Sequence, residues 1–281
     1  MHFRAEAATT LHTSSETRSI ATDASSGCCC CSCCFSLLFG TIFGCVDPIT
    51  TIVACLGGGR SVFTVPVGMK DKAAEAHSHF AVKGSDLLTL LRVYDAWADI
   101  RDVRSRRDFC RDHFLSDSAL LAIATLRNQL LTCLVELKFL NPGNLRQRDA
   151  ANRYASSARV LKAVTCAGLY PRVVKIKLPQ RKYIETSAGA MEDLGKVEQT
   201  KYLLQGGERV YLHPGSVMVK EAPEANMNLF LIFYEKVETS KVYLRDATDI
   251  SPVSALQLRC PSLRCCPAAV TTAMGTRSWT R

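Results

Sequence analysis

The sequence has few of the residues and motifs on which enzymes usually depend. It has six histidines, and the closest pair, His77 and His79, is separated by two positions, which puts the two rings on different faces of a helix. No Ser/His/Asp or Cys/His combination is indicated. The glycine run Gly57 to Gly59 is not followed by the Gly-Lys-Ser/Thr of a phosphate-binding loop. The sequence therefore favours a binding or structural protein over an enzyme in its own right.

Long uninterrupted apolar segments are also lacking. Residues 35 to 56 carry a single charge, but that charge is Asp47 and a proline follows it, which argues against a membrane span. No secretory signal is recognisable at the N-terminus. Six of the fourteen cysteines lie between Cys28 and Cys34, yet no second pair of cysteines or histidines stands at the spacing of a zinc site. A palmitoylated anchor at these cysteines remains an alternative.

Acidic residues are nearly absent from residues 141 to 183. This segment contains ten basic side chains and one acidic one, so its net charge is +9. The net charge of the whole chain is also +9, which means that the remaining residues are balanced. A concentrated positive charge is expected where a protein contacts a phosphate backbone, and an acidic protein surface is the other candidate partner.

Apolar residues make up 47% of the sequence, which is enough for a sizeable core. In the first half they recur at helical spacing. Asp47 and Pro48 predict the start of a short buried helix, capped by the Asp47 side chain and ending at Gly57. Further helices are expected over 71–82, after a cap at Ser85, from 117 or 118, and over about 145–167. Five cysteines in apolar surroundings are predicted to be buried thiols of a reducing compartment: Cys45, Cys55, Cys110, Cys133 and Cys166.

The second half alternates with the period of strands. Residues 170–178 place Val174, Ile176 and Leu178 on one face, with Lys175 and Lys177 on the other. Residues 207–252 predict three further strands joined by turn-rich segments. Four or five short strands after a helical region predict an α+β chain in which a helical bundle precedes a small five-stranded barrel of the oligonucleotide-binding (OB) type.

Several segments in the same order resemble the C-terminal accessory region of DEAH-box RNA helicases, in the RNA helicase A branch. The resemblance extends from 37 to 252 and is carried by LLFGTIFGCVDPITTIVACL (37–56), FAVKGSDLLTLLRVYDAW (80–97), FCRDHFLS (109–116), AGLYPRVVKI (167–176), GERVYLHPGSV (207–217) and YEKVETSKVYLRDATDISP (234–252). It implies a helicase-associated, ratchet-like helical domain and then an OB-fold that helps to hold single-stranded RNA against two RecA-like motor domains.

The sequence also departs from that family. No Gly-Lys-Ser/Thr loop, Asp-Glu-Ala-His motif or arginine finger is found in the 281 residues, so ATP cannot be bound here as the family binds it. Leu87 stands where the family has a histidine after Ser-Asp. Gly215 replaces a serine of the His-Pro-Ser-Ser turn.

The resemblance suggests a division of the chain and a binding surface. Residues 1–36 are expected to be disordered and cysteine-rich, 37–168 to be the helicase-associated domain, 169–255 the OB-fold and 256–281 a divergent tail. No catalytic, cofactor-binding or metal-binding residue is expected, since ATP and Mg²⁺ belong to the motor domains of the family. Eight residues are the candidates for RNA binding: Arg172, Lys175, Lys177, Arg181, Lys182, His213, Ser216 and Lys241.

The expected function is that of an RNA-binding accessory portion of an ATP-dependent RNA helicase, inactive as an enzyme on its own. Its expected partners are single-stranded RNA, RecA-like motor domains in cis or in trans, and a helicase-activating protein on the OB-fold, but no membrane. The expected location is the nucleus or the cytoplasm. The alternative is a free-standing structural or interaction protein tethered to a membrane through the run from Cys28 to Cys34.

Overall fold

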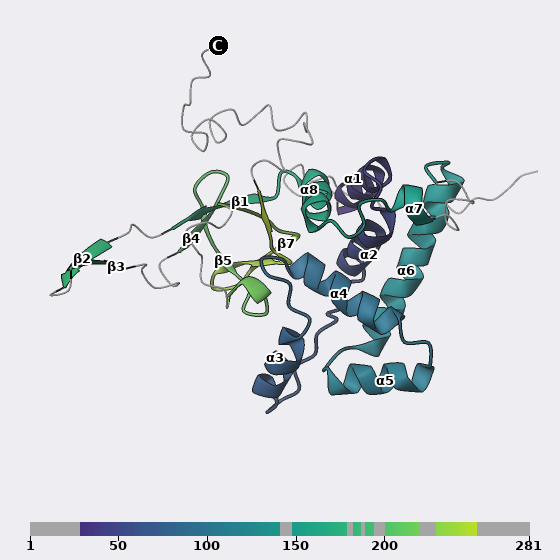
Figure 1. Ribbon diagram of the computed structural model, residues 1–281, viewed down its shortest axis with the longest axis horizontal. Coiled ribbons are helices and arrows are strands. Elements are labelled where there is room, and N and C mark those ends of the chain that lie inside the picture. Colours follow the sequence, from purple (N-terminus) through teal and green to yellow (C-terminus); the bar gives the residue numbers. More distant parts are fainter. Residues whose placement is uncertain are drawn as a thin grey trace, which may run out of the picture.

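The computed structural model describes residues 29–140, 148–178, 182–186, 189–193, 200–219 and 229–251. Figure 1 shows a helical half beside a sheet, as the predicted α+β order requires. The helices of the described residues are α1 (Cys29–Ile42), α2 (Val46–Gly57), α3 (Lys70–Ser78), α4 (Asp86–Ala98), α5 (Val103–Asp112), α6 (Asp117–Glu136), α7 (Arg148–Ala151) and α8 (Ala158–Leu169).

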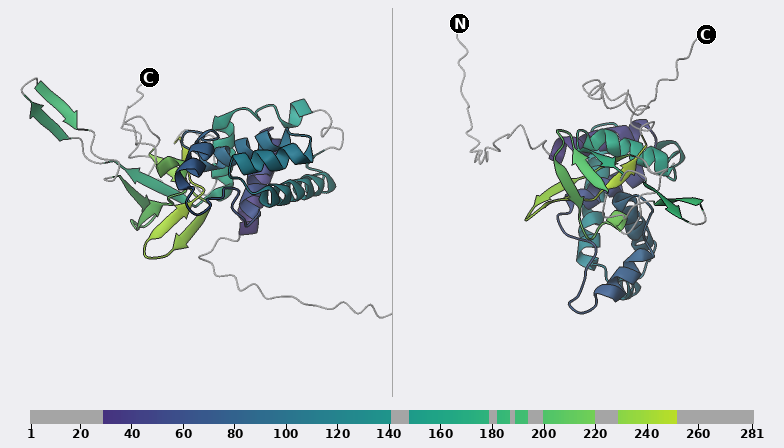
Figure 2. Two further views of the ribbon diagram at one scale, coloured as in Figure 1. Left: turned by 90° about the horizontal axis from the view of Figure 1, so that it is seen from below. Right: turned by 90° about the vertical axis from the view of Figure 1, so that its left-hand side faces the viewer.

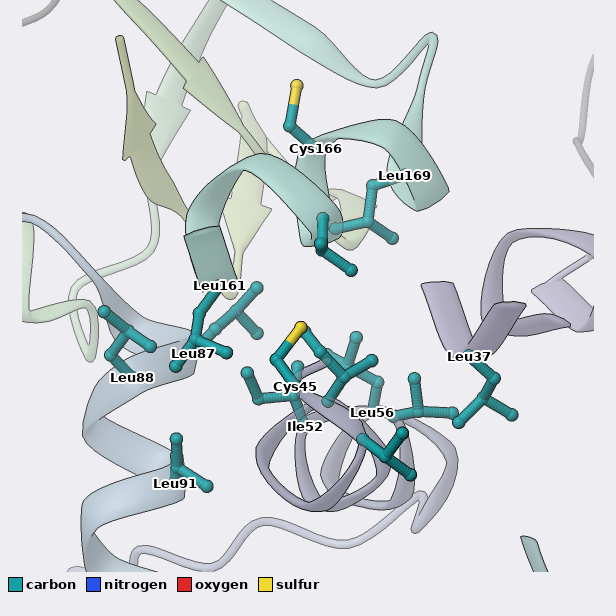
Figure 3. Packing of buried hydrophobic residues seen from close by; sticks show 14 of the residues in the cluster. Leu37, Cys45, Ile52, Leu56, Leu87, Leu88, Leu91, Leu161, Cys166 and Leu169 are labelled. Carbon is teal, nitrogen blue, oxygen red and sulfur yellow. The ribbon is translucent and has the colours of Figure 1, made fainter. Parts of the chain in front are cut away.

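The helical half is built around α2. Nine of its side chains are buried, and it packs against α1, α4, α6 and α8. Figure 3 shows this core at close range, with Ile52 of α2 facing the leucines of α4 and Leu161 of α8. Burial of such a continuous apolar set is the main source of stability for helices of this length, which are marginal in isolation.

Local signals predicted several helix ends correctly. The Ser85 side chain accepts a hydrogen bond from the backbone N–H of Leu88 and so caps α4 as expected. Helix α6 begins at Asp117, one of the two predicted starts, although its cap is the hydroxyl of Ser116, and α2 ends at Gly57 as expected. The single helix predicted over 145–167 is wrong, because the described residues form two helices there, α7 and α8, separated by a turn.

The predicted cap at Asp47 is wrong as well. Asp47 lies inside the first turn of α2, and its carboxylate accepts hydrogen bonds from Arg127 at 2.8 Å and from the Asn152 side chain at 3.0 Å. The backbone N–H of Asp47 donates to the Asn152 side-chain oxygen at 2.8 Å. These partners are 80 and 105 residues away in sequence, so a local pattern could not reveal them. Asp47 therefore ties α2 to α6 and to the chain after α7.

The disorder predicted for residues 1–36 does not hold for the part that the structure describes, because α1 begins at Cys29. Ser36 is buried and lies directly against Gly168 of α8. A side-chain carbon added to Gly168 would collide with the Ser36 hydroxyl oxygen. The two helices thus cross at a contact that has no room for a larger residue.

The strands of the larger sheet are β1 (Val173–Lys177), β4 (Lys201–Leu204), β5 (Arg209–Leu212), β6 (Phe230–Ile232), β7 (Glu235–Glu238), β8 (Val242–Arg245) and β9 (Thr248–Ile250). They lie in the order β7-β8-β5-β4-β1-β6-β9, and β5 and β8 are parallel while the other described pairs are antiparallel. The hairpin β2 (Lys182–Thr186) and β3 (Gly189–Asp193) forms a separate sheet that projects away from the rest (Figure 2).

The sheet curls because β6 and β7 belong to one bent segment. The backbone N–H of Phe233 donates to the carbonyl oxygen of Arg172, beside β1. The next N–H, that of Tyr234, donates to the carbonyl oxygen of Arg245 in β8. Two consecutive residues thus bond to the chain at β1 and to β8, which are not neighbours in the sheet. The inner face of the curled sheet holds an apolar core that includes Val174, Leu231 and Leu244, which are fully buried. This arrangement agrees with the predicted OB-type fold, although β7 and β9 remain the two ends of the sheet.

The two halves meet at a set of polar contacts that we call the joint. Gly84 and Asp86, before and at the start of α4, pair with the chain around β9. The Asp86 N–H donates to the carbonyl oxygen of Ala247, and the Asp249 N–H donates to the carbonyl oxygen of Gly84. The Asp86 carboxylate accepts from the N–H groups of Val217 at 2.8 Å and Ala247 at 3.0 Å. The Ser85 and Thr248 hydroxyls also bond to each other, and Lys162 of α8 forms an ion pair with Asp249. The joint therefore covers the outer edge of β9.

The apolar segment 35–56 is divided between α1 and α2 by a turn at Phe43 and Gly44. Among the described residues, α6 is the helix long and apolar enough to cross a bilayer by length and composition. Leu120, Ile123 and Leu134 of α6 are buried in the helical half, while 22% of its apolar window as a whole is buried.

Candidate nucleic-acid interface

Alternate side chains of four neighbouring strands point away from the apolar core of the curled sheet and share one surface, which we call the outer face. Cross-strand pairing places Lys175 of β1 beside Leu203 of β4, which lies beside Arg209 of β5. Tyr211 of β5 pairs with Tyr243 of β8. Paired residues point to the same side of a sheet. The polar and aromatic residues of the outer face are Lys175, Lys177, Lys201, Arg209, Tyr211, His213, Lys241, Tyr243 and Arg245.

The outer face carries an excess of positive charge. Its lysines and arginines are exposed. Arg245 has Glu235 as an acidic partner at 3.8 Å, and both side chains of that pair are about half exposed, so the pair contributes little. Within the described part of the chain no carboxylate forms an ion pair with the other five cations: Lys175, Lys177, Lys201, Arg209 and Lys241. Lys177 and Lys201 are direct cross-strand neighbours, a like-charged pair that costs free energy unless an anion lies nearby.

Aromatic rings lie among these cations. The Tyr211 and Tyr243 rings are 6.2 Å apart between centroids, and the His213 ring lies edge-on to Tyr243 at 6.5 Å. Lys241 and Arg209 both stand over the Tyr211 ring, at 4.8 and 5.1 Å from its centroid. Partial burial and the charge of Arg245 lower the pKa of His213 from its usual value, so this imidazole is mainly neutral at pH 7.

Four of the eight residues predicted to bind RNA are brought together on the outer face. Lys175 and Lys177 stand on β1, His213 follows β5, and Lys241 precedes β8. His213 also shapes the turn after β5, because its Nδ1 accepts a hydrogen bond from the N–H of Gly215 at 3.1 Å.

Three of the other four predicted residues are described, and they are not part of the outer face. Arg172 is half-buried and donates to the carbonyl oxygen of Tyr234 at 2.7 Å, so it holds the bend between β6 and β7. Ser216 is buried, and its hydroxyl accepts a hydrogen bond from the N–H of Met218. The backbone of Lys182 belongs to β2, in the separate hairpin, and Arg181 lies outside the described residues. The structure therefore does not bring Arg172, Ser216 or the backbone of Lys182 to the outer face.

The sequence pattern missed five residues of the outer face: Lys201, Arg209, Tyr211, Tyr243 and Arg245. A usable signal was present. Residues 209–213 (RVYLH) and 241–245 (KVYLR) both follow the order basic, Val, Tyr, Leu, basic. The two copies become β5 and β8 and pair in register, which brings like residues side by side.

Other site types find little support in the described residues. No group of three or more His, Cys, Asp or Glu among them could hold a metal ion. Burial raises the pKa of the Cys45 and Cys55 thiols to about 12 and that of Cys110 to about 11, so these thiols are protonated and poor nucleophiles at neutral pH. The predicted burial of Cys133 is wrong, since its side chain is exposed on α6.

Comparison with known protein families gives two matches. Residues 36–121 match the helicase associated domain (HA2), ratchet-like, and residues 161–263 match the oligonucleotide/oligosaccharide-binding (OB)-fold family.

Three curated relatives are much longer than the chain. The DExH-box ATP-dependent RNA helicase DExH1 of Arabidopsis thaliana is 36% identical over 225 residues, which are 78% of this chain and 20% of that protein. Human DHX36, an ATP-dependent DNA/RNA helicase, is 32% identical over 225 residues, which cover 78% of this chain and 20% of DHX36. Human DHX57, a putative ATP-dependent RNA helicase, is 33% identical over 238 residues, covering 76% and 17% of the two chains. The chain thus spans about a fifth of the length of these relatives.

Proposed function

Because the chain belongs to the DEAH-box helicase family and corresponds to its C-terminal accessory region, we propose that it binds single-stranded RNA through the outer face of its OB-fold. The observation that supports this most is a set of five cations that have no carboxylate partner among the described residues, on β1, β4 and β5 and just before β8, interleaved with two tyrosines. Single-stranded nucleic acid is bound by such surfaces, since cations contact phosphates and rings contact bases without strong sequence preference.

In this proposal the chain has no motor of its own. ATP and Mg²⁺ bind to RecA-like domains supplied in cis or in trans, and the helical half with its OB-fold holds the RNA strand against them. A helicase-activating protein that docks on the OB-fold is the further partner that the family resemblance implies. The complex acts inside the cell, in the nucleus or the cytoplasm.

The test is a salt titration of RNA binding. We expect the purified chain to bind a fluorescent oligouridine with an affinity that falls steeply as salt increases, because counterions return to the phosphates. Replacing Lys175 and Lys177 by glutamate should weaken binding and lower the magnitude of the log-log slope by about 0.7 for each phosphate that the protein no longer neutralises. Fluorescence anisotropy at four salt concentrations measures both quantities.

The matched control changes Lys70 and Lys72, an exposed pair with the same spacing on α3, to glutamate. Figure 1 shows α3 well away from β1. The control makes the same change in net charge, so an equal loss of binding in both variants would mean that overall charge, and not the outer face, attracts RNA. Absence of RNA binding by the unmodified chain would favour the alternative of a structural or interaction protein.

A further inference from the structure

The outer face contains a repeated arrangement that extends the proposed function to a defined subsite. β5 and β8 run parallel with Tyr211 opposite Tyr243. Two positions before the tyrosines stand Arg209 and Lys241, and two positions after them stand His213 and Arg245. Because alternate residues of a strand point the same way, these pairs form three successive rungs, one aromatic rung between two basic ones.

The first basic rung is a candidate anion site. Arg209 and Lys241 come from different strands, yet both lie within about 5 Å of the centre of the Tyr211 ring. Among the described residues neither side chain forms an ion pair or a hydrogen bond. The nearest acidic residue in sequence, Glu208, is engaged by Lys236 at 3.2 Å. Two cations held at the same ring repel each other, and a phosphate bound by both would reduce that cost.

The last rung pairs a charged group with a neutral one. A terminal nitrogen of Arg245 lies 3.5 Å from Nε2 of His213. The imidazole is largely neutral, so Arg245 supplies the positive charge and His213 a ring and a hydrogen-bonding nitrogen. Four residues of strand separate the first rung from the last, a distance of about 13 Å at roughly 3.3 Å per residue.

We propose that these rungs bind one short stretch of a single strand, with a phosphate on each basic rung and the intervening bases against Tyr211 and Tyr243. In the bound state Arg209 and Lys241 turn from the Tyr211 ring to the phosphate, which frees the ring for a base. This inference rests on the proposed function and deepens it, because it assigns the tyrosines to base stacking. A duplex keeps its bases stacked on one another and inaccessible to the rings, so the subsite selects single-stranded nucleic acid.

The test compares two ligands that differ only in their bases: a twelve-residue oligouridine and a ribose-phosphate oligomer of the same length without bases. Tyr211→Leu and Tyr243→Leu, made separately in the full chain, should weaken oligouridine binding about tenfold each and leave binding of the abasic oligomer unchanged. Tyr154→Leu, at an exposed tyrosine in the helical half, is the matched control and should alter neither. The double variant R209Q/K241Q should weaken both ligands by the same factor and flatten the salt dependence.

Circular dichroism melts accompany each variant, so that unfolding is not mistaken for weaker binding. If the tyrosine variants weaken both ligands equally, or neither, the stacking role is overturned while the proposed RNA binding stands. If the unmodified chain binds neither ligand, the proposed function fails and this inference falls with it. If an acidic peptide competes fully with oligouridine, and the tyrosine variants change the binding of neither ligand, the rungs would be reassigned to a protein partner.

Discussion

At the scale of single residues, the most unusual group is the carboxyl of Asp246, which follows β8. Burial raises its pKa from 3.8 to about 6, and the neighbouring carboxylates of Asp86 and Glu235 add to the effect, while Arg245 opposes it. The folded pKa therefore lies above that of the unfolded chain. The free-energy penalty for ionising Asp246 in the folded state is absent below about pH 4, grows between about pH 4 and pH 6, and is complete above about pH 6.

Replacing Asp246 with Asn should therefore stabilise the protein at pH 8 by up to about 3 kcal/mol and have little effect near pH 4. Asn suits the position because the residue has a φ of 54°, a left-handed conformation that Asn tolerates. Urea denaturation across this pH range measures the free energy of unfolding, with Glu75→Gln on the exposed face of α3 as control. A stability difference that does not vary with pH would contradict the assignment.

At the scale of elements, the crossing of α1 and α8 gives a prediction whose sign is opposite to helix propensity. Gly→Ala inside a helix normally stabilises by about 1 kcal/mol. At Gly168 the added carbon would lie 2.8 Å from the Ser36 side-chain carbon and 2.9 Å from its backbone nitrogen, so α1 must move away. We expect Gly168→Ala to destabilise by about 1 to 3 kcal/mol.

The companion variant Ser36→Gly removes the two closest side-chain atoms and should restore part of the stability when combined with Gly168→Ala. Thermal melts of the two single variants and the double variant give the coupling energy. Additive effects would mean that α1 does not pack on α8 as described.

The same scale shows what the sequence could and could not predict. Ser85 and Gly57 mark helix ends through local chemistry, so they were found correctly. Strands β4, β7 and β9 escape prediction because their sequences, KYLL, EKVE and TDI, do not alternate apolar and polar residues, whereas β5 and β8, which are equally short, do. Asp47 and Ser216 were assigned wrongly or placed on the wrong surface because their partners are fixed by packing: Arg127 lies far away in the sequence, and the hydroxyl of Ser216 turns inward to a backbone N–H.

At the scale of the whole molecule, the joint adds polar contacts to the apolar cluster, including Ile232 and Ile250, that also connects the two halves. Asp86→Ala would leave the backbone N–H groups of Val217 and Ala247 without the carboxylate that accepts from them. Such changes typically cost about 2 to 5 kcal/mol. We expect the variant to become sensitive to limited proteolysis between the halves, near residues 79–84 and 251, while Asp86→Asn keeps part of the protection. Equal cleavage of the variant and the unmodified chain would show that the joint does not hold the halves together.

The second whole-molecule prediction concerns chemistry. Phosphoryl transfer needs a phosphate cradle and a carboxylate that holds Mg²⁺, and the 281 residues offer neither motif. We expect no RNA-stimulated ATP hydrolysis from the purified chain in a phosphate-release assay. Turnover that follows the protein through purification would contradict this.

The position of Asp86 has a mechanical consequence. His213, at the end of β5, is four residues before Val217, and Arg245, at the end of β8, is two residues before Ala247. One carboxylate from the start of α4 thus clamps the continuations of both strands, which prevents β5 from sliding along β8. A pull on a nucleic-acid strand bound across β5 and β8 would therefore be transmitted through Asp86 to α4. The helical half would move together with that strand.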